Sequence, residues 1–120
     1  MNSVQSKLEE WLQNIIATEK PDSQIKVFRF GLSEGYLVYL AGSERYEEAD
    51  VEWASYPPNF VAREELTISE SEAGEWHQML QQTMEFLKGK LRQNAVQQSF
   101  LGVNTPVYTG FVDGDLYRVN

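Results

Sequence analysis

The fold is decided by residues 25–41, which read IKVFRFGLSEGYLVYLA. Residues 25–32 and 36–41 are rich in β-branched and aromatic side chains, which favour strands. The connection between them, residues 33–35, is short and contains glycine, so the pair is predicted to form a β-hairpin. Residues 37–40 are continuously apolar. Such a run is typical of a central strand that is covered on both faces.

An amphipathic helix is predicted on each side of this hairpin in the sequence. Before it, apolar residues recur at helical spacing, and they are Val4, Leu8, Trp11, Leu12, Ile15 and Ile16. After it, a second helix is predicted from Ser69, because Ser69 and Glu72 have the spacing of a capping box. The buried stripe of the second helix is predicted to consist of Trp76, Met79, Leu80, Thr83, Met84, Leu87 and Leu91.

The remaining segments complete the element order α-β-β-(β)-α-β-β. Short strands are predicted at residues 51–55 and 64–68, and a C-terminal hairpin is predicted at residues 107–119, where residues 113–114 form an Asp-Gly turn. A chain of this length is expected to form one domain, residues 1–120. We therefore expect an α+β fold in which the two helices pack on one face of an antiparallel β-sheet.

The net charge of −8 comes entirely from residues 44–75. This acidic window holds ten acidic residues against Arg45 and Arg63, and the rest of the chain is neutral. We expect its carboxylates to gather in one outer patch that another macromolecule covers. The acidic balance argues against nucleic acid and anionic membranes as partners, because both would be repelled.

Three sequence features predict a cytoplasmic location. Cysteine is absent, so no disulfide forms, which suits a reducing compartment. The N-terminal residues show no basic region followed by an apolar run, so no signal peptide is expected. No apolar stretch approaches the roughly 20 residues that cross a bilayer.

The sequence offers few candidates for catalysis. His77 is the one histidine, and no nucleophile-elbow pattern accompanies it. Two carboxylate pairs, Asp50 with Glu52 and Asp113 with Asp115, have strand spacing and could serve acid–base chemistry such as glycoside hydrolysis. The second pair also resembles a fragment of a calcium loop, but the rest of that motif is missing and a hairpin turn accounts for it. We expect no enzyme activity, no metal and no cofactor.

The acidic window also carries aromatic residues, and this mixture predicts a protein-binding surface. Aromatic side chains are typical interface anchors, and two adjacent prolines stiffen the loop that carries them. A basic protein would be the complementary partner. The predicted contact residues are Glu47, Glu48, Asp50, Glu52, Trp53, Tyr56 and Phe60. The alternative is a solvated acidic face with the aromatic side chains buried in the core.

Three stretches together resemble a family of small acidic bacterial proteins that is associated with immunity in polymorphic-toxin systems. They are YLVYLAGS at residues 36–43, DVEWA at residues 50–54 and GFVDGDL at residues 110–116. The resemblance implies a cytoplasmic inhibitor that occludes a toxin by tight binding. It implies no catalytic residues.

Two other classes of protein remain open. The size, acidity and element order resemble type III secretion chaperones, which dimerise and hold an effector segment. Those chaperones usually end in a third helix, whereas a terminal hairpin is predicted here. A small hydrolase would require a concave pocket that holds a carboxylate with a shifted pKa. Both a monomer and a homodimer are compatible with the sequence.

Overall fold

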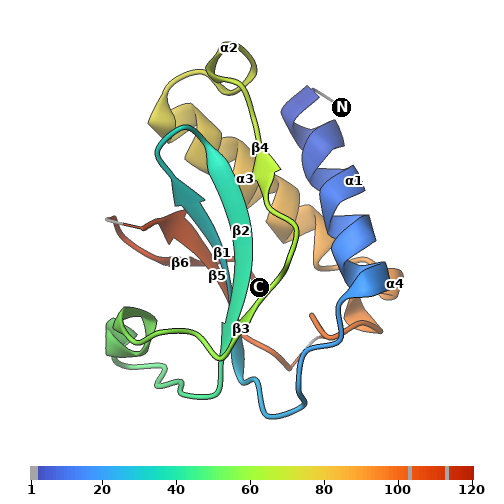
Figure 1. The fold of residues 1–120 in the computed structure, drawn as a ribbon, viewed down its shortest axis with the longest axis vertical. Coiled ribbons are helices and arrows are strands. Elements are labelled where there is room, and N and C mark those ends of the chain that lie inside the picture. Colours follow the sequence, from blue (N-terminus) through green and yellow to red (C-terminus); the bar gives the residue numbers. More distant parts are fainter. Residues whose placement is uncertain (1–2, 103, 113) are drawn as a thin grey trace.

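The computed structural model describes residues 3–102, 104–112 and 114–120, and it confirms the α+β class (Figure 1). Its described residues form a mixed six-stranded sheet with helices packed against it. The elements in chain order are α1 (Ser3–Thr18), β1 (Val27–Ser33), β2 (Leu37–Ser43), the 3₁₀ helix η1 (Val51–Ser55), β3 (Phe60–Val61), β4 (Leu66–Thr67), α2 (Glu70–Ala73), α3 (Trp76–Lys90), α4 (Asn94–Gln97), β5 (Val107–Phe111) and β6 (Tyr117–Arg118).

The predicted hairpin of β1 and β2 is confirmed and forms the centre of the sheet. β1 and β2 pair antiparallel from Val27 opposite Ser43 to Ser33 opposite Leu37. β2 also pairs with β3 and β4, and β5 pairs antiparallel with β6. The prediction of a purely antiparallel sheet is wrong at one pair, because β1 and β5 run parallel. A parallel pair requires a crossover connection, and the chain makes one through α3 before it enters β5.

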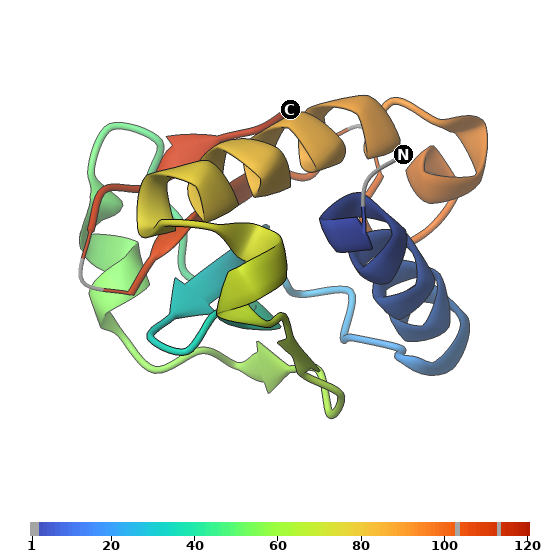
Figure 2. The ribbon, with the colours of Figure 1, turned by 90° about the horizontal axis from the view of Figure 1, so that it is seen from above.

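The two faces of the sheet are covered by different elements. Phe28, Phe30 and Leu32 alternate along β1 and share one core with the buried faces of α1 and α3, as predicted. Val27 and Tyr108 lie on the opposite face and form a second, smaller cluster. Figure 2 shows α1 on one side of the sheet and η1 on the other.

The second predicted helix is in fact two helices, α2 and α3. Gly74 ends α2 with a φ of +79°, a left-handed conformation that favours glycine. Glu75 then starts α3 through a capping box with Gln78. Trp76, predicted to be buried, is the first residue of α3 and is 61% exposed. The prediction is wrong because it assumed one continuous helix from Ser69 to Leu91. Gly74 ends α2, so Trp76 begins a new helix and does not continue the buried stripe.

The segment predicted as a strand at residues 51–55 is the 3₁₀ helix η1. Asp50 caps it, since its Oδ1 accepts a hydrogen bond of 3.0 Å from the backbone N–H of Glu52. Asp is a poor strand former and a good cap, so the cap overrides the strand pattern. The strand predicted at residues 64–68 is confirmed only at its centre, as the two-residue β4. The C-terminal hairpin is confirmed as β5 and β6, but Asp113 in its turn lies outside the described residues.

Within the described ranges, no helix combines the length and the apolar character that crossing a membrane requires.

Candidate functional site

The first candidate site is the acidic loop, which we define as residues 44–58, the connection from β2 through η1 towards β3. Its acidic side chains are all exposed, and they are Glu44, Glu47, Glu48, Asp50 and Glu52. Arg45 is the one basic residue of the loop. The four acidic residues predicted to contact a partner therefore lie, all exposed, on one short segment.

Trp53, predicted as a partner contact, is instead in the interior and is only 4% exposed. Its indole ring packs against Tyr46 and Tyr108, with ring centroids 5.6 Å and 5.3 Å away. Val27 and Tyr108 lie on the sheet face opposite the main core, in a cluster that contains no residue of α1 or α3. Trp53 covers this face, so it anchors the acidic loop to the sheet rather than offering a surface to a partner.

A hydrogen bond between two tyrosines completes this anchor. The hydroxyl oxygens of Tyr46 and Tyr108 are 2.9 Å apart, beneath the acidic loop. Burial, together with the hydrogen bond to Tyr108, raises the pKa of Tyr46 from 10.0 to about 12. The neutral form of Tyr46 is therefore the form that the folded protein favours.

Alkaline pH is expected to destabilise the fold through Tyr46. Between pH 10.0 and about 12 the unfolded chain loses the Tyr46 proton while the folded chain keeps it. The stabilisation from Tyr46 is thus complete below pH 10.0 and is lost as the pH rises through about 12. A tyrosinate absorbance titration checks this, because the step near pH 12 should vanish in Tyr46→Phe. An unchanged titration in that variant would assign the step to another group.

The other two predicted aromatic anchors differ from each other. Tyr56 is 44% exposed, and the guanidinium of Arg45 lies 4.1 Å from its ring centroid. Phe60 is half-buried and packs edge-on against Phe28, with centroids 6.2 Å apart. Phe60 therefore belongs to the main core, and Tyr56 is the predicted anchor that a partner could reach.

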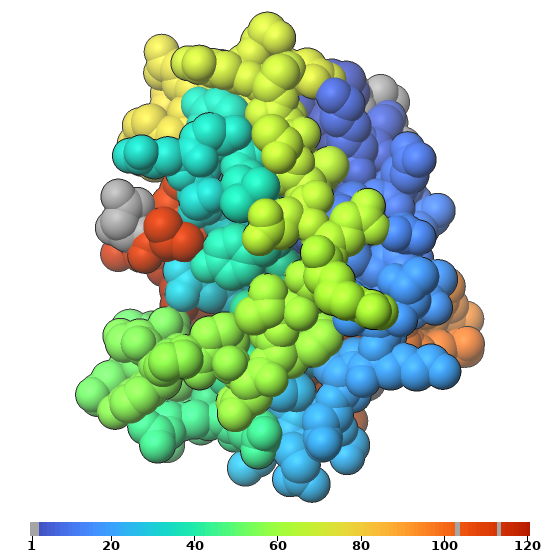
Figure 3. Space-filling model, in the orientation of Figure 1, coloured from blue at the N-terminus to red at the C-terminus, as the bar shows by residue number. Residues whose placement is uncertain are grey.

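The acidic window does not form the single patch that was expected. The window crosses one side of the molecule from η1 to α2, which lie near opposite ends of its longest axis (Figures 1 and 3). That axis extends 38 Å, several times the screening length of roughly 8 Å at physiological salt. The charges at the two ends therefore act as separate local surfaces.

Glu64 and Glu72, two carboxylates of the acidic window beyond the acidic loop, have structural partners. Glu64 accepts a hydrogen bond from Asn14 of α1. Glu72 lies 2.5 Å from the Lys7 Nζ of α1, and this contact, with a hydrogen bond from Ser69, lowers the pKa of Glu72 to about 2. These residues hold β4 and α2 against α1. The acidic loop is thus the part of the window whose charge is best placed for a partner.

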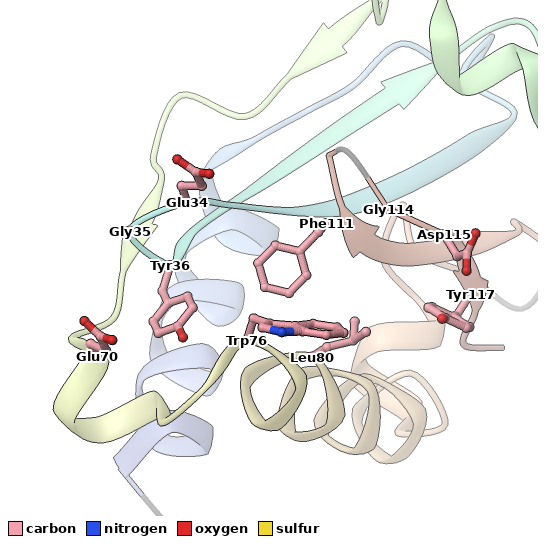
Figure 4. A pocket seen from close by; sticks show the side chains of 10 residues that line it. All are labelled: Glu34, Gly35, Tyr36, Glu70, Trp76, Leu80, Phe111, Gly114, Asp115 and Tyr117. Carbon is pink, nitrogen blue, oxygen red and sulfur yellow. The ribbon is translucent and has the colours of Figure 1, made fainter.

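The second candidate site, which sequence reasoning missed, is a pocket around Trp76 with a volume of about 610 Å³ (Figure 4). We call it the aromatic pocket. It is lined by Glu34, Gly35, Tyr36, Glu70, Trp76, Leu80, Phe111, Gly114, Asp115 and Tyr117. These residues come from the β1–β2 turn, α2, α3, β5, the β5–β6 connection and β6, so no local sequence pattern joins them. The one sequence signal is the helix break at Gly74, which places Trp76 at a helix start.

The walls of the aromatic pocket are held in place. Trp76 and Phe111 pack edge to face, with centroids 6.1 Å apart and an interplanar angle of 82°. The Tyr36 hydroxyl donates a 2.7 Å hydrogen bond to the Gly74 carbonyl. Tyr36 has a φ of +56°, a conformation that bulky residues rarely adopt. The hydrogen bond to Gly74, at the end of α2, therefore ties the Tyr36 side chain of the β1–β2 turn to α2.

Catalytic and metal candidates gain no further support from the geometry. The Nδ1 of His77 lies 3.5 Å from the Oε2 of Glu75, and both side chains are exposed. Asp50 serves as the cap of η1. Among the residues that the structure describes, no group of three His, Cys, Asp or Glu side chains is arranged to hold a metal ion.

The chain matches no protein-family model, no curated protein and no solved structure. The resemblance to immunity proteins therefore stays a prediction.

Proposed function

We propose that this protein is a non-catalytic binding module, an immunity-type inhibitor in the cytoplasm that binds a basic protein partner through the acidic loop. The observation that supports this proposal is the combination of five exposed carboxylates with a buried aromatic anchor directly beneath them. The partner would be blocked by occlusion, so the inhibitor itself needs no reactive group.

The acidic loop is pre-organised for binding. Besides the Trp53 anchor, the backbone N–H of Glu44 donates a 2.8 Å hydrogen bond to the Asn59 side chain. Glu48 lies 3.5 Å from the Arg118 guanidinium of β6. A loop that is already ordered loses less conformational freedom when it docks, and this leaves more of the contact energy for affinity.

Electrostatics would act on both the rate of association and the stability of the complex. The overall charge of −8 steers a basic partner towards the protein. Close pairs between loop carboxylates and partner Lys or Arg side chains then fix the orientation. Tyr56 supplies an exposed aromatic surface beside Glu52, since its hydroxyl lies 3.5 Å from the Glu52 carboxylate.

Charge reversal in the acidic loop is expected to slow association with the partner by about tenfold at low salt. The experiment mixes the purified protein with the products of neighbouring genes and measures association rates for any pair that binds. Glu52→Lys is the test variant. Glu10→Lys is the matched control, because it makes the same change in net charge on an exposed residue of α1, on the other side of the sheet.

The two variants separate local contact from overall charge. A larger loss of rate in Glu52→Lys than in Glu10→Lys supports the acidic loop as the interface. Equal losses would show that only net charge matters and would contradict the proposal. A stable dimer that holds an extended segment of its partner would instead indicate a secretion chaperone.

A further inference from the structure

We infer that the aromatic pocket receives an arginine side chain of the basic partner, as a second contact site apart from the acidic loop. The inference rests on the proposed function for the basic nature of the partner.

Trp76 is the exposed member of the three tryptophans in this chain. Trp11 and Trp53 are each 4% exposed, whereas Trp76 is 61% exposed. Tyr117, which lines the pocket, is 39% exposed. Val112 follows the lining residue Phe111 in the chain and is 52% exposed. An apolar surface of this kind is costly in water, and clustered exposed aromatics mark binding surfaces.

The charges of the lining decide which ligand fits. Every charged residue among the described lining residues is acidic, namely Glu34, Glu70 and Asp115. Glu34 and Glu70 lie on the Tyr36 side of the pocket, and Asp115 lies on the opposite side beside Tyr117 (Figure 4). An anion would be repelled, and a neutral apolar ligand would shield carboxylates from water without pairing them. A cation is the complement.

Arginine suits this lining better than other cations. Its planar guanidinium stacks on the face of an indole ring, and its N–H groups form paired hydrogen bonds with carboxylates. Lysine presents a compact, strongly hydrated charge that does not stack. The volume of about 610 Å³ lies within the roughly 300–1,000 Å³ that is usual for ligand pockets. It therefore has room for an arginine together with parts of the neighbouring residues of a peptide.

The aromatic pocket and the acidic loop are connected through residues 114–118. Asp115 and Tyr117 line the pocket. Leu116, between them, packs against the Trp53 cluster beneath the acidic loop, and Arg118 contacts Glu48 of that loop. One basic partner could therefore reach both sites.

The test uses N-acetyl-arginine amide as the probe and N-acetyl-citrulline amide as its neutral analogue of the same shape. Binding is followed by NMR through the indole N–H signal of Trp76, with the signals of the buried tryptophans as internal references. We expect arginine amide to bind with a dissociation constant of about 1 mM. Citrulline amide should bind at least about tenfold more weakly, because it lacks the charge.

Variants locate the binding. The triple variant Glu34→Gln, Glu70→Gln and Asp115→Asn neutralises the acidic lining residues and should weaken arginine binding about tenfold or more. Neutralising three loop residues with Glu44→Gln, Glu47→Gln and Glu52→Gln changes the net charge equally and should leave binding within about twofold. Trp76→Ala, at an exposed position, should abolish saturable binding. Because this variant lacks the Trp76 indole signal, the ring signals of Tyr36 and Phe111 serve as the readout.

The inference would be overturned if citrulline amide bound as tightly as arginine amide, or if the triple variant of the acidic lining residues bound arginine amide as the parent does. Because the probe requires no protein partner, this outcome leaves the charge-reversal experiment on the acidic loop unaffected. Conversely, equal rate losses for Glu52→Lys and Glu10→Lys would contradict the proposed function while arginine still bound in the pocket.

Discussion

Trp53→Ala is expected to lower the free energy of unfolding by about 3–5 kcal/mol. Trp53 is only 4% exposed and packs between Tyr46 and Tyr108. Its removal leaves a cavity on the sheet face that η1 covers, and neighbouring side chains can fill that cavity only in part. The acidic loop would also lose its anchor, so a partner should bind more weakly even where the variant remains folded.

Equilibrium denaturation in urea measures this effect. Trp76→Ala is the matched control, because it makes the same substitution at a side chain that is 61% exposed. Its cost should be smaller, because little area is lost from the interior and the edge-to-face contact with Phe111 adds only about 0.5–1.5 kcal/mol. If the two substitutions cost the same, Trp53 would not be the anchor of the acidic loop.

Gly110→Ala is expected to destabilise the fold by about 1–3 kcal/mol. A Cβ atom at Gly110 would lie 2.2 Å from the backbone carbonyl oxygen of Asp115, where the chain crosses β5. Backbone cannot move aside as a flexible side chain can. The 114–116 segment must therefore shift, and because Asp115 lines the aromatic pocket, the pocket should change shape as well.

Gly89→Ala in α3 is the control for this substitution. A Cβ at Gly89 meets open space, with no atom within 4 Å. Alanine is favoured over glycine in a helix by roughly 0.5–1 kcal/mol, so this variant should be slightly more stable than the parent. Thermal and denaturant unfolding should give opposite signs for the two variants. A neutral Gly110→Ala would contradict the close crossing of β5 by residue 115.

The elements that local patterns determine were predictable from the sequence. The stripe from Val4 to Ile15 predicts α1, and the two apolar runs around Gly35 predict the β1–β2 hairpin. Both depend on residues close together in the chain. The parallel pairing of β1 with β5 was not predictable in this way, because it joins strands that are about two-thirds of the chain apart and depends on where α3 returns the chain.

The candidate site was predictable only in part. Glu47, Glu48, Asp50 and Glu52 are exposed as expected, because charged side chains rarely leave water. Trp53 was misplaced because its burial depends on Val27 and Tyr108, which the sequence does not show to be adjacent. The aromatic pocket was missed because its lining comes from several distant segments.

The outer strands of the sheet limit how other chains can attach. β3, β4 and β6 are each two residues long, so each offers few unpaired backbone N–H and C=O groups to an incoming strand. Short outermost strands of this kind hinder edge-to-edge aggregation. Recognition of a partner would then depend on side chains rather than on strand addition, and copies of this protein could accumulate with little tendency to polymerise through their sheets.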